Sequence, residues 1–242
     1  MEEKVFADFS KAHLYNLSER LREVSKTVIS CNKVADIGCD HGYVAISLIE
    51  SGKINSALCM DINEGPLEAA KEHIRTAGYE NVIETRLSNG LHNATAGDEI
   101  ESIIVAGMGG NLVSTIIDEG SDIVKGLKQM VLQPQSELFL VRKKIRELGF
   151  YIDSEKFLID MGKYYWIMDA RPGKQECMEP NMQELYDNYS EFLIKSKDSL
   201  YKEYIENSIR INEGYLKGIS DGNSASLNQK INDLKQVLNL MS

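Results

Sequence analysis

Apolar and polar residues alternate in blocks through the first 171 residues, and the blocks predict strands and helices in turn. Short runs that are apolar throughout are typical of strands buried in a parallel sheet, whereas apolar residues at every third or fourth position are typical of helices. The predicted strands cover residues 34–37, 57–60, 83–87, 102–106 and 129–133. The predicted helices cover residues 10–30, 43–51, 66–77, 110–119 and 136–148.

This alternation predicts an α/β fold, in which a doubly wound parallel sheet has right-handed crossovers. After the last of these helices, residues 151–158 and 164–171 have the pattern of an antiparallel pair of strands that turns at residues 160–162. Pro66 in the first turn of its helix and Gly149 after the end of another are residues that favour such boundaries. The predicted sheet is therefore parallel, with an antiparallel hairpin at its end.

Beyond a breaker-rich linker at residues 172–181, the pattern becomes purely helical. Apolar residues recur at steps of three and four through residues 182–216, and the same spacing resumes after a break at 218–223. The apolar positions after the break are Leu227, Ile231, Leu234, Leu238 and Met241. This predicts a coiled-coil-like helical hairpin over 182–242, whose first arm of about 35 residues would be roughly 50 Å long. Such an arm would grip a large partner, pair with a second subunit, or fold against the first domain at 1–171.

Composition narrows the class of protein. Hydrophobic residues make up 43% and charged residues 26% of the 242 positions, as in a soluble globular protein. No apolar run approaches the roughly 20 residues that a membrane-spanning helix needs, and the first residues lack the pattern of a secretory signal. The four cysteines show no C-x-x-C spacing and the four histidines are scattered. We therefore expect free thiols, a cytoplasmic protein and no metal site.

The charge of the chain does not decide whether its partner is a nucleic acid. A net charge of −10 argues mildly against nucleic acid, because phosphate binding needs a basic surface. Basic residues nevertheless gather at 11–26, 142–146 and 195–217, and local charge matters more than the total. Each of these groups is more often a solvated helix face than a binding patch.

The candidate chemistry is concentrated after the first predicted strand, in Gly38-Cys-Asp-His-Gly42, and after the second, which ends in Asp61. A strand, a glycine turn, a helix and a strand that ends in an acid form the unit that binds nucleosides. The acid can accept hydrogen bonds from both ribose hydroxyls, and glycine lets the backbone approach the ligand closely. The G-x-G-x-x-G sequence of a pyrophosphate site is absent, which favours S-adenosylmethionine over NAD. The alternative is an ordinary tight turn before a helix.

Turns rich in polar residues or glycine also follow the third and fourth predicted strands, and the carboxyl ends of parallel strands share the edge of the sheet where ligands bind. Asp61 is predicted to bond the ribose and Asn89 the adenine amino group, while Asp36 and Asp40 would face the positively charged methionine portion. Alternatively, Asp36 is a structural carboxylate that bonds turn amides. The predicted cofactor-binding residues are Asp36, Gly38, Asp40, Gly42, Asp61, Ile62, Asn89, Gly90 and Ala106.

Four strings carry a resemblance to a known family: Ala35-Asp-Ile-Gly-Cys-Asp-His-Gly-Tyr43, Asn89-Gly-Leu91, Ala106-Gly-Met-Gly-Gly110 and Val131-Leu-Gln-Pro134. Together they resemble the bacterial tRNA (adenine-22-N1)-methyltransferases, over residues 14–171 by motif and over the rest by architecture. That family joins a class I methyltransferase domain, a Rossmann-like sheet with a terminal antiparallel hairpin, to a C-terminal helical domain. This chain departs from the family pattern at Asn89, where aspartate is commoner, and at Gly42, where alanine is commoner.

The resemblance implies methyl transfer from S-adenosyl-L-methionine to N1 of adenine 22 in tRNA, with the helical arm holding the tRNA. Adenine N1 has a lone pair that is largely unprotonated at neutral pH, so positioning is the main requirement. The glycine loop after the fourth strand would bring carbonyls to the base edge, Tyr43 or His41 would stack on the base, and Asp40 would stabilise positive charge. The predicted catalytic residues are Asp40, His41, Tyr43, Gly107, Met108, Gly109 and Gly110, and the predicted substrate-binding residues are Arg20, Gln133 and Pro134.

Structural roles are the alternative for three of these residues: a turn-stabilising imidazole for His41, core packing for Tyr43 and a surface salt bridge for Arg20. Two other functions stay open. One is a class I methyltransferase for a small molecule or protein, whose helical arm serves for dimerisation. The other is a non-catalytic nucleoside-binding fold whose hairpin recruits a partner. The pattern does not decide the oligomeric state, although a monomer is favoured.

Overall fold

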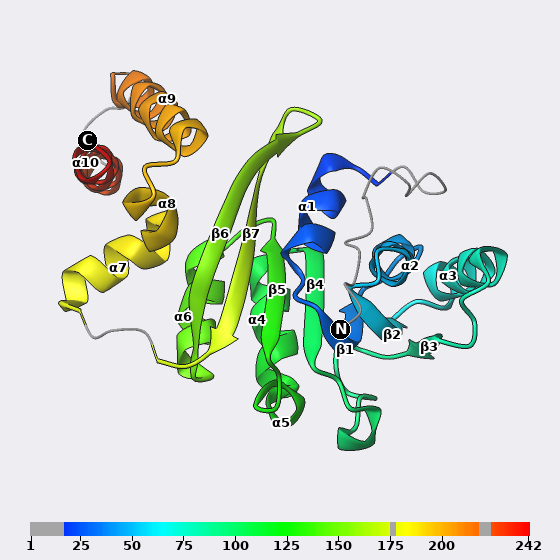
Figure 1. Cartoon of the computed structure of the whole chain (residues 1–242). Helices are drawn as coiled ribbons and strands as arrows, with labels where there is room; N and C mark the ends of the chain where they lie inside the picture. The colour runs from blue at the N-terminus through cyan, green and yellow to red at the C-terminus, as the bar shows by residue number, and fades with distance from the viewer. Residues whose placement is uncertain (1–16, 175–177, 218–223) are drawn as a thin grey trace, which may run out of the picture.

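The fold is built on a single seven-stranded sheet with the strand order β3-β2-β1-β4-β5-β7-β6. The computed structural model describes residues 17–174, 178–217 and 224–242 (Figure 1). The first five strands are parallel, and β7 runs antiparallel to both of its neighbours. The strands are β1 (Cys31–Ile37), β2 (Ile54–Asp61), β3 (Ile83–Leu87), β4 (Ser102–Met108), β5 (Gln129–Pro134), β6 (Phe150–Asp160) and β7 (Lys163–Pro172). The predicted parallel sheet with a terminal hairpin is confirmed.

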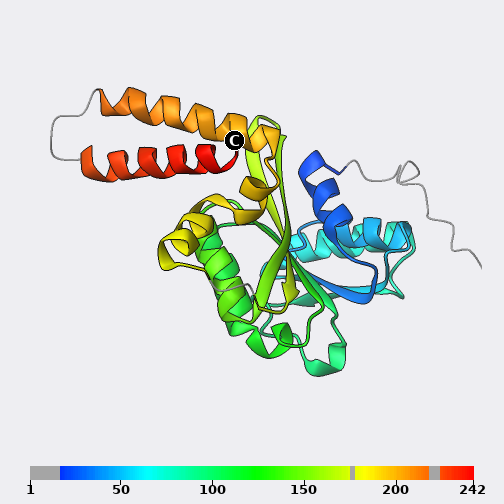
Figure 2. The same cartoon turned by 60° about the vertical axis from the view of Figure 1, so that its left-hand side comes forward.

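Helices cover both faces of the sheet, and each face buries its own apolar cluster. Val24, Ala45 and Ile74 represent the cluster under α1, α2 and α3, and Val113 and Ile145 the one under α4 and α6. Figure 2 shows the two helical layers on either side of the sheet. The helices are α1 (Glu19–Thr27), α2 (Tyr43–Glu50), α3 (Glu64–Ala77), α4 (Gly110–Glu119), α5 (Ser121–Val124) and α6 (Leu138–Glu147), with a 3-10 turn at Ala96–Asp98.

The first helix differs from the prediction over residues 10–30. Within the described residues, α1 begins at Glu19, where the Ser18 side chain accepts a hydrogen bond from the Leu21 amide, and it ends at Thr27. Residues 10–16 lie outside the described residues. The chain is extended from Val28 and enters β1 at Cys31, three residues before the predicted start of that strand. Polar side chains at the beginning of β1 hide this start from the apolar pattern.

Four helices follow the sheet: α7 (Pro180–Tyr189), α8 (Glu191–Lys195), α9 (Ser199–Leu216) and α10 (Ser224–Leu240). The prediction of one continuous arm of about 35 residues is wrong. Ser190 and Lys197 have positive φ angles of 56° and 51°, which end α7 and α8. Because α9 has 18 residues, it is only about 27 Å long at the helical rise of about 1.5 Å per residue. The predicted break at 218–223 lies outside the described residues.

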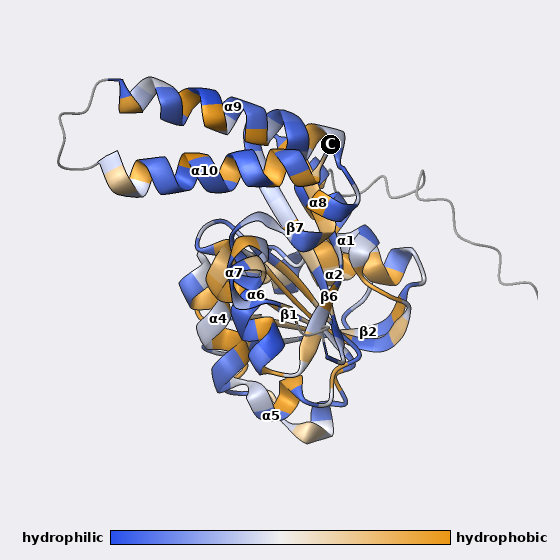
Figure 3. Ribbon diagram, turned by 90° about the vertical axis from the view of Figure 1, so that its left-hand side faces the viewer, coloured by the Kyte–Doolittle hydropathy of each residue, from blue (hydrophilic) through white to orange (hydrophobic). Residues whose placement is uncertain are grey.

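The last two helices lie side by side and project away from the sheet (Figure 3). Ile231, Leu234 and Met241 are buried as the seam predicts, and Val237 joins them. At the base of the pair, Phe157 of β6 packs against Tyr201 and other aromatic residues. No helix among the described residues has the length and apolar character needed to cross a bilayer.

One buried and one partly buried ion pair help to attach α7 and α8 to the sheet and to α6. Arg142 of α6 lies 2.6 Å from the Glu155 carboxylate of β6, and both side chains are almost fully buried. The Ser190 hydroxyl donates a hydrogen bond to the second oxygen of Glu155, and Arg146 makes two hydrogen bonds to the Asp187 carboxylate. The end of α7 at Ser190 therefore coincides with a polar anchor on helix α6 and strand β6.

Candidate active site

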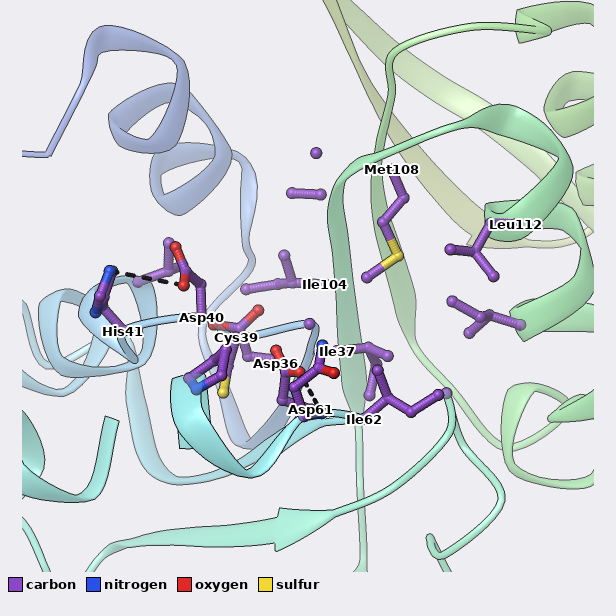
Figure 4. A pocket seen from close by; sticks show the side chains of 18 of the residues that line it. Asp36, Ile37, Cys39, Asp40, His41, Asp61, Ile62, Ile104, Met108 and Leu112 are labelled. Carbon is purple, nitrogen blue, oxygen red and sulfur yellow. Dashed lines mark hydrogen bonds and ion pairs between the residues drawn. The ribbon is translucent and has the colours of Figure 1, made fainter. Parts of the chain in front are cut away.

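A cavity of about 700 Å³ opens at the carboxyl ends of the central parallel strands, below α1 (Figure 4). Its walls come from the turns after β1, β2 and β3 and from the end of β4, so the predicted convergence of these turns is confirmed. The strand β1 lies between β2 and β4, and the connections leave it in opposite directions. This is the topological switch point at which open α/β sheets bind ligands.

The turn after β1 is fastened to the neighbouring strand. The amides of Gly38 and Cys39 both donate to the Met60 carbonyl, at 2.7 and 3.1 Å. Gly38 has a φ of +72°, and a Cβ added there would lie 2.2 Å from the Met108 terminal methyl carbon. The backbone conformation therefore favours glycine here, and a larger residue would also displace the terminal methyl of Met108, which lines the cavity.

The floor of the cavity is acidic. Asp36 is only 4% exposed, and its Oδ2 has no hydrogen-bond partner within the described part of the chain. Burial, together with the negative charges of Asp61 and Asp40, raises the pKa of the Asp36 carboxyl to about 7. A buried carboxylate without a partner is costly, and a positively charged ligand would relieve that cost. The site therefore fits a cationic group.

Asp61 is held in a defined orientation at the end of β2, where its Oδ1 accepts a hydrogen bond of 2.9 Å from the Asn63 amide. Ile62 beside it is 60% exposed and lines the cavity. A carboxylate next to an exposed apolar side chain suits a ribose and the face of an attached base. Several lining residues were not predicted: Leu21, Ile37, Cys39, Val44, Asn63, Pro66, Ser88, Ile104, Leu112, Ile116 and Gln135.

Two of these unpredicted residues show what a sequence signal can reveal. Leu112 and Ile116 lie four residues apart on α4, directly after the glycine turn, so they share one helix face. Ile116 also contacts Gly90, since a Cβ on that glycine would lie 3.0 Å from the Ile116 Cγ1 atom. The helical spacing after the glycine turn would have identified both as residues on the face of α4 that lines the cavity.

An aromatic group stands at the rim. The rings of His41 and Tyr43 are stacked with centroids 5.5 Å apart, and the Tyr43 ring also stacks on His73 at 4.7 Å. The Tyr43 hydroxyl lies 3.2 Å from Nε2 of His73, whose Nδ1 lies 3.1 Å from the His41 carbonyl. Asp40 is exposed, with its carboxylate 3.6 Å from Nε2 of His41. The structure thus brings the predicted catalytic residues Asp40, His41 and Tyr43 together, and His73 joins this group.

The end of β4, where the predicted glycine loop begins within the strand, is tied to α1. Gly107, with a φ of +81°, donates its amide to Oε1 of Gln133 at 3.1 Å, and Nη1 of Arg20 donates to the same oxygen at 2.6 Å. The Arg20 guanidinium also lies over the Tyr165 ring, 5.5 Å from its centroid. Arg20 is thus part of the cavity wall rather than of a surface salt bridge.

Five predicted site residues do not line the cavity: Gly42, Gly109, Gly110, Gln133 and Pro134. Each of the three glycines instead lies where neighbouring atoms of the protein pack closely against it. A Cβ on Gly110 would lie 2.3 Å from the Ser136 carbonyl oxygen, one on Gly109 would lie 3.2 Å from the Ser136 hydroxyl, and one on Gly42 would lie 3.3 Å from Ala70 Cβ. Gln133 is buried, and its side-chain amide is occupied by protein groups. Among the described residues, no group of three or more His, Cys, Asp or Glu side chains is arranged to hold a metal ion.

Comparison with known proteins agrees with this geometry. A family described as "Methyltransferase domain" matches residues 17–168. The Bacillus subtilis tRNA (adenine(22)-N(1))-methyltransferase is 26% identical over 234 residues, which are 93% of this chain and 95% of that protein.

Solved structures extend the similarity to the whole fold. Streptococcus pneumoniae Sp1610 in complex with S-adenosyl-L-methionine has a TM-score of 0.82 and 29% identity, over 92% of this chain and 99% of that one. TrmK of M. capricolum in complex with S-adenosyl-homocysteine has a TM-score of 0.84 and 25% identity, over 94% and 100% of the two chains. The strand order, the cavity at the switch point and the matched family together show that this chain belongs to the methyltransferase-domain family and has its class I, Rossmann-like fold.

Proposed function

We propose that this protein transfers a methyl group from S-adenosyl-L-methionine to N1 of adenine 22 in tRNA. The observation that carries the proposal is the cavity itself, in which the buried acid Asp36, the acid Asp61 at the end of β2 and the glycine of Ala106–Gly107 meet at one edge of the sheet. Relatives that align with nearly the whole chain are named for this activity or are bound to this cofactor.

The cavity offers a separate group for each part of the cofactor, which supplies a methyl group on positively charged sulfur. Asp61 accepts hydrogen bonds from the ribose hydroxyls, and Ile62 covers one face of the adenine, whose amino group Asn89 bonds. Asp36 faces the cationic methionine end, where its ionised form gains a partner. Burial strengthens this attraction, because the effective dielectric constant there is lower than in water.

The protein's task at the acceptor is mainly alignment. Adenine N1 is a nucleophile without prior deprotonation, so the groups at the mouth of the cavity need to hold the base in line with the methyl carbon. Tyr43 and His41 at the rim provide stacking surfaces for a base taken out of its helix. Methylation makes the base cationic, and the carboxylate of Asp40 beside them stabilises that charge as it develops.

The C-terminal helices would hold the body of the tRNA. Arg210, Lys217 and Lys230 are exposed on α9, directly after it, and on α10. Contacts of these cations with phosphates would make the affinity fall steeply with salt. We infer a catalytic domain at 1–171, a linker at 172–181 and a tRNA-holding helical domain at 182–242, in a cytoplasmic enzyme that acts as a monomer.

A methylation assay on unmodified tRNA transcripts tests this proposal. The purified protein is incubated with labelled cofactor and a transcript that carries adenine at position 22, and the product nucleoside is identified by mass spectrometry. We expect 1-methyladenosine from this transcript and no product from a matched transcript with guanine at position 22. Methylation of both transcripts, or a product methylated on the exocyclic nitrogen, would contradict the proposal, and cofactor binding without tRNA methylation would favour another substrate.

A further inference from the structure

Gln133 is a fully buried amide next to the cavity whose hydrogen bonds are all made within the protein. Its Oε1 accepts hydrogen bonds from Arg20 Nη1 at 2.6 Å and from the Gly107 amide at 3.1 Å. Its Nε2 donates to the Pro134 carbonyl oxygen at 3.2 Å. A buried amide whose oxygen and nitrogen both have partners within the protein is held in one orientation. It therefore fixes the two groups that it bonds.

One of these groups is a cation that has no acid as partner. Within the described residues, Arg20 is in no ion pair; its guanidinium contacts the Gln133 oxygen and the Tyr165 ring, which are neutral. Its backbone amide donates to Asp160 at 3.2 Å, which secures the first turn of α1 to the β6–β7 hairpin. A guanidinium held by neutral groups at the wall of a cavity keeps its positive charge available to an oxyanion.

The other group is the peptide between Ala106 and Gly107, both of which line the cavity. A trans peptide points its N–H and its C=O in opposite directions. Because the Gly107 N–H points to Gln133 on β5, the Ala106 carbonyl points away from β5. This carbonyl belongs to the loop that would accept a hydrogen bond from the edge of the target base.

We propose that Gln133 is a positioning residue, which holds Arg20 as an oxyanion-binding group and the Ala106–Gly107 peptide as an acceptor in one fixed arrangement. The inference rests on the proposed function and deepens it. The oxyanion is either the carboxylate of the cofactor's methionine portion or a phosphate of the target nucleotide. Both present the same chemistry to a guanidinium, and Arg20 and His41 are the basic residues that line the cavity within the described chain.

The same strand offers a matched control. Gln129, at the opposite end of β5, is equally buried, and both polar atoms of its amide likewise have partners: its Oε1 accepts from the Ile29 amide, and its Nε2 donates to Asp169 at 2.8 Å. It does not line the cavity. Replacing either glutamine by methionine removes a buried amide of similar size, but only the change at residue 133 releases Arg20 and the Gly107 peptide.

The test compares Gln133→Met, Gln133→Glu and Gln129→Met in the full chain. Calorimetry with S-adenosylhomocysteine measures cofactor affinity, and methylation of the transcript gives kcat, the KM for tRNA and its dependence on salt. We expect Gln133→Met to weaken the binding of one reactant by roughly 10- to 100-fold, the usual effect of losing a hydrogen bond to a charged group, and to lower kcat. Gln133→Glu keeps an acceptor for Gly107 but neutralises Arg20, so it should weaken that binding while kcat stays closer to the original.

The two measurements, calorimetry with the cofactor product and kinetics with tRNA, identify the oxyanion. A rise in the Kd for S-adenosylhomocysteine assigns it to the cofactor carboxylate, whereas a rise in the KM for tRNA with a salt slope smaller by about one assigns it to a phosphate. Unchanged Kd, KM and kcat in Gln133→Met, or equal changes in Gln129→Met, would overturn the proposal. If the parent protein does not methylate tRNA, the proposed function fails, while the calorimetric arm still tests whether Gln133 positions Arg20 for the cofactor.

Discussion

Two regions of this molecule bury carboxylates, and they do so in opposite ways. At the junction between the sheet and the C-terminal helices, Glu155 lies 2.6 Å from Arg142 and accepts a second bond from Ser190. In the cavity, Asp36 is also buried, but its Oδ2 has no partner within the described chain, and the charges of Asp61 and Asp40, which raise its pKa, are of the same sign.

This difference distinguishes a buried carboxylate that stabilises the fold, Glu155, from one that is free to bind a ligand, Asp36. A buried ion pair is held because removal of one member leaves the other unpaired. A buried acid without a partner is a cost in the free protein, and functional sites are where such costs are usually found. The junction is therefore expected to respond to mutation with lost stability, and the cavity with altered binding.

The largest expected effect is at the junction. Glu155→Gln keeps the size of the side chain but leaves the Arg142 guanidinium buried without its counter-ion. We expect the free energy of unfolding to fall by about 3–5 kcal/mol, measured by urea denaturation followed by circular dichroism. The double variant Arg142→Met with Glu155→Leu should recover most of this loss, because no charge then remains buried. A single variant as stable as the parent would show that the pair does not hold the junction.

A smaller effect, on binding rather than stability, is expected at Asp61. Asp61→Ala removes the acceptor proposed for the ribose hydroxyls, and a hydrogen bond to a charged group is worth about 1.5–3 kcal/mol. The Kd for S-adenosylhomocysteine, measured by calorimetry, should rise by roughly 10- to 100-fold. Asp122→Ala, at an exposed site on α5, serves as the control and should leave the Kd unchanged. Equal affinity in the Asp61 variant would place the ribose elsewhere.

The smallest effect concerns Asp36 and pH. Its pKa is raised from 3.8 to about 7, so the folded state binds the proton more tightly than the unfolded state. Its contribution to stability is complete below pH 4 and is lost as the pH rises through about 7. A cationic ligand prefers the ionised form, so cofactor affinity should rise by about tenfold between pH 6 and pH 8. Asp36→Asn should bind more weakly with a flat profile; the same pH dependence in this variant would assign the titration to another group.

Much of the fold can be predicted from local patterns in the amino-acid sequence. The apolar strands, the helices between them and the glycines after β1 and β4 depend on periodicity and on backbone conformations that glycine alone adopts easily. The helical arm shows where this reasoning ends, since the breaks at Ser190 and Lys197 have positive φ angles without a glycine or proline to signal them. The Ser190 hydroxyl caps α8 by accepting from the Leu193 amide, which is a local contact, and it donates to Glu155, which only the folded sheet brings near.

The candidate site also has features that local sequence patterns predict and features that depend on tertiary contacts. The order of residues is enough to predict which acids and glycines lie at the strand ends, because parallel strands bring their carboxyl ends to one edge of the sheet. What each residue does there depends on tertiary contacts: Gln133 bonds Arg20, Gly110 lets α4 pack against the segment after β5, and His73 of α3 stacks on Tyr43. These roles depend on distances between residues far apart in the chain, which the packing of helices on the sheet sets and which no local pattern encodes.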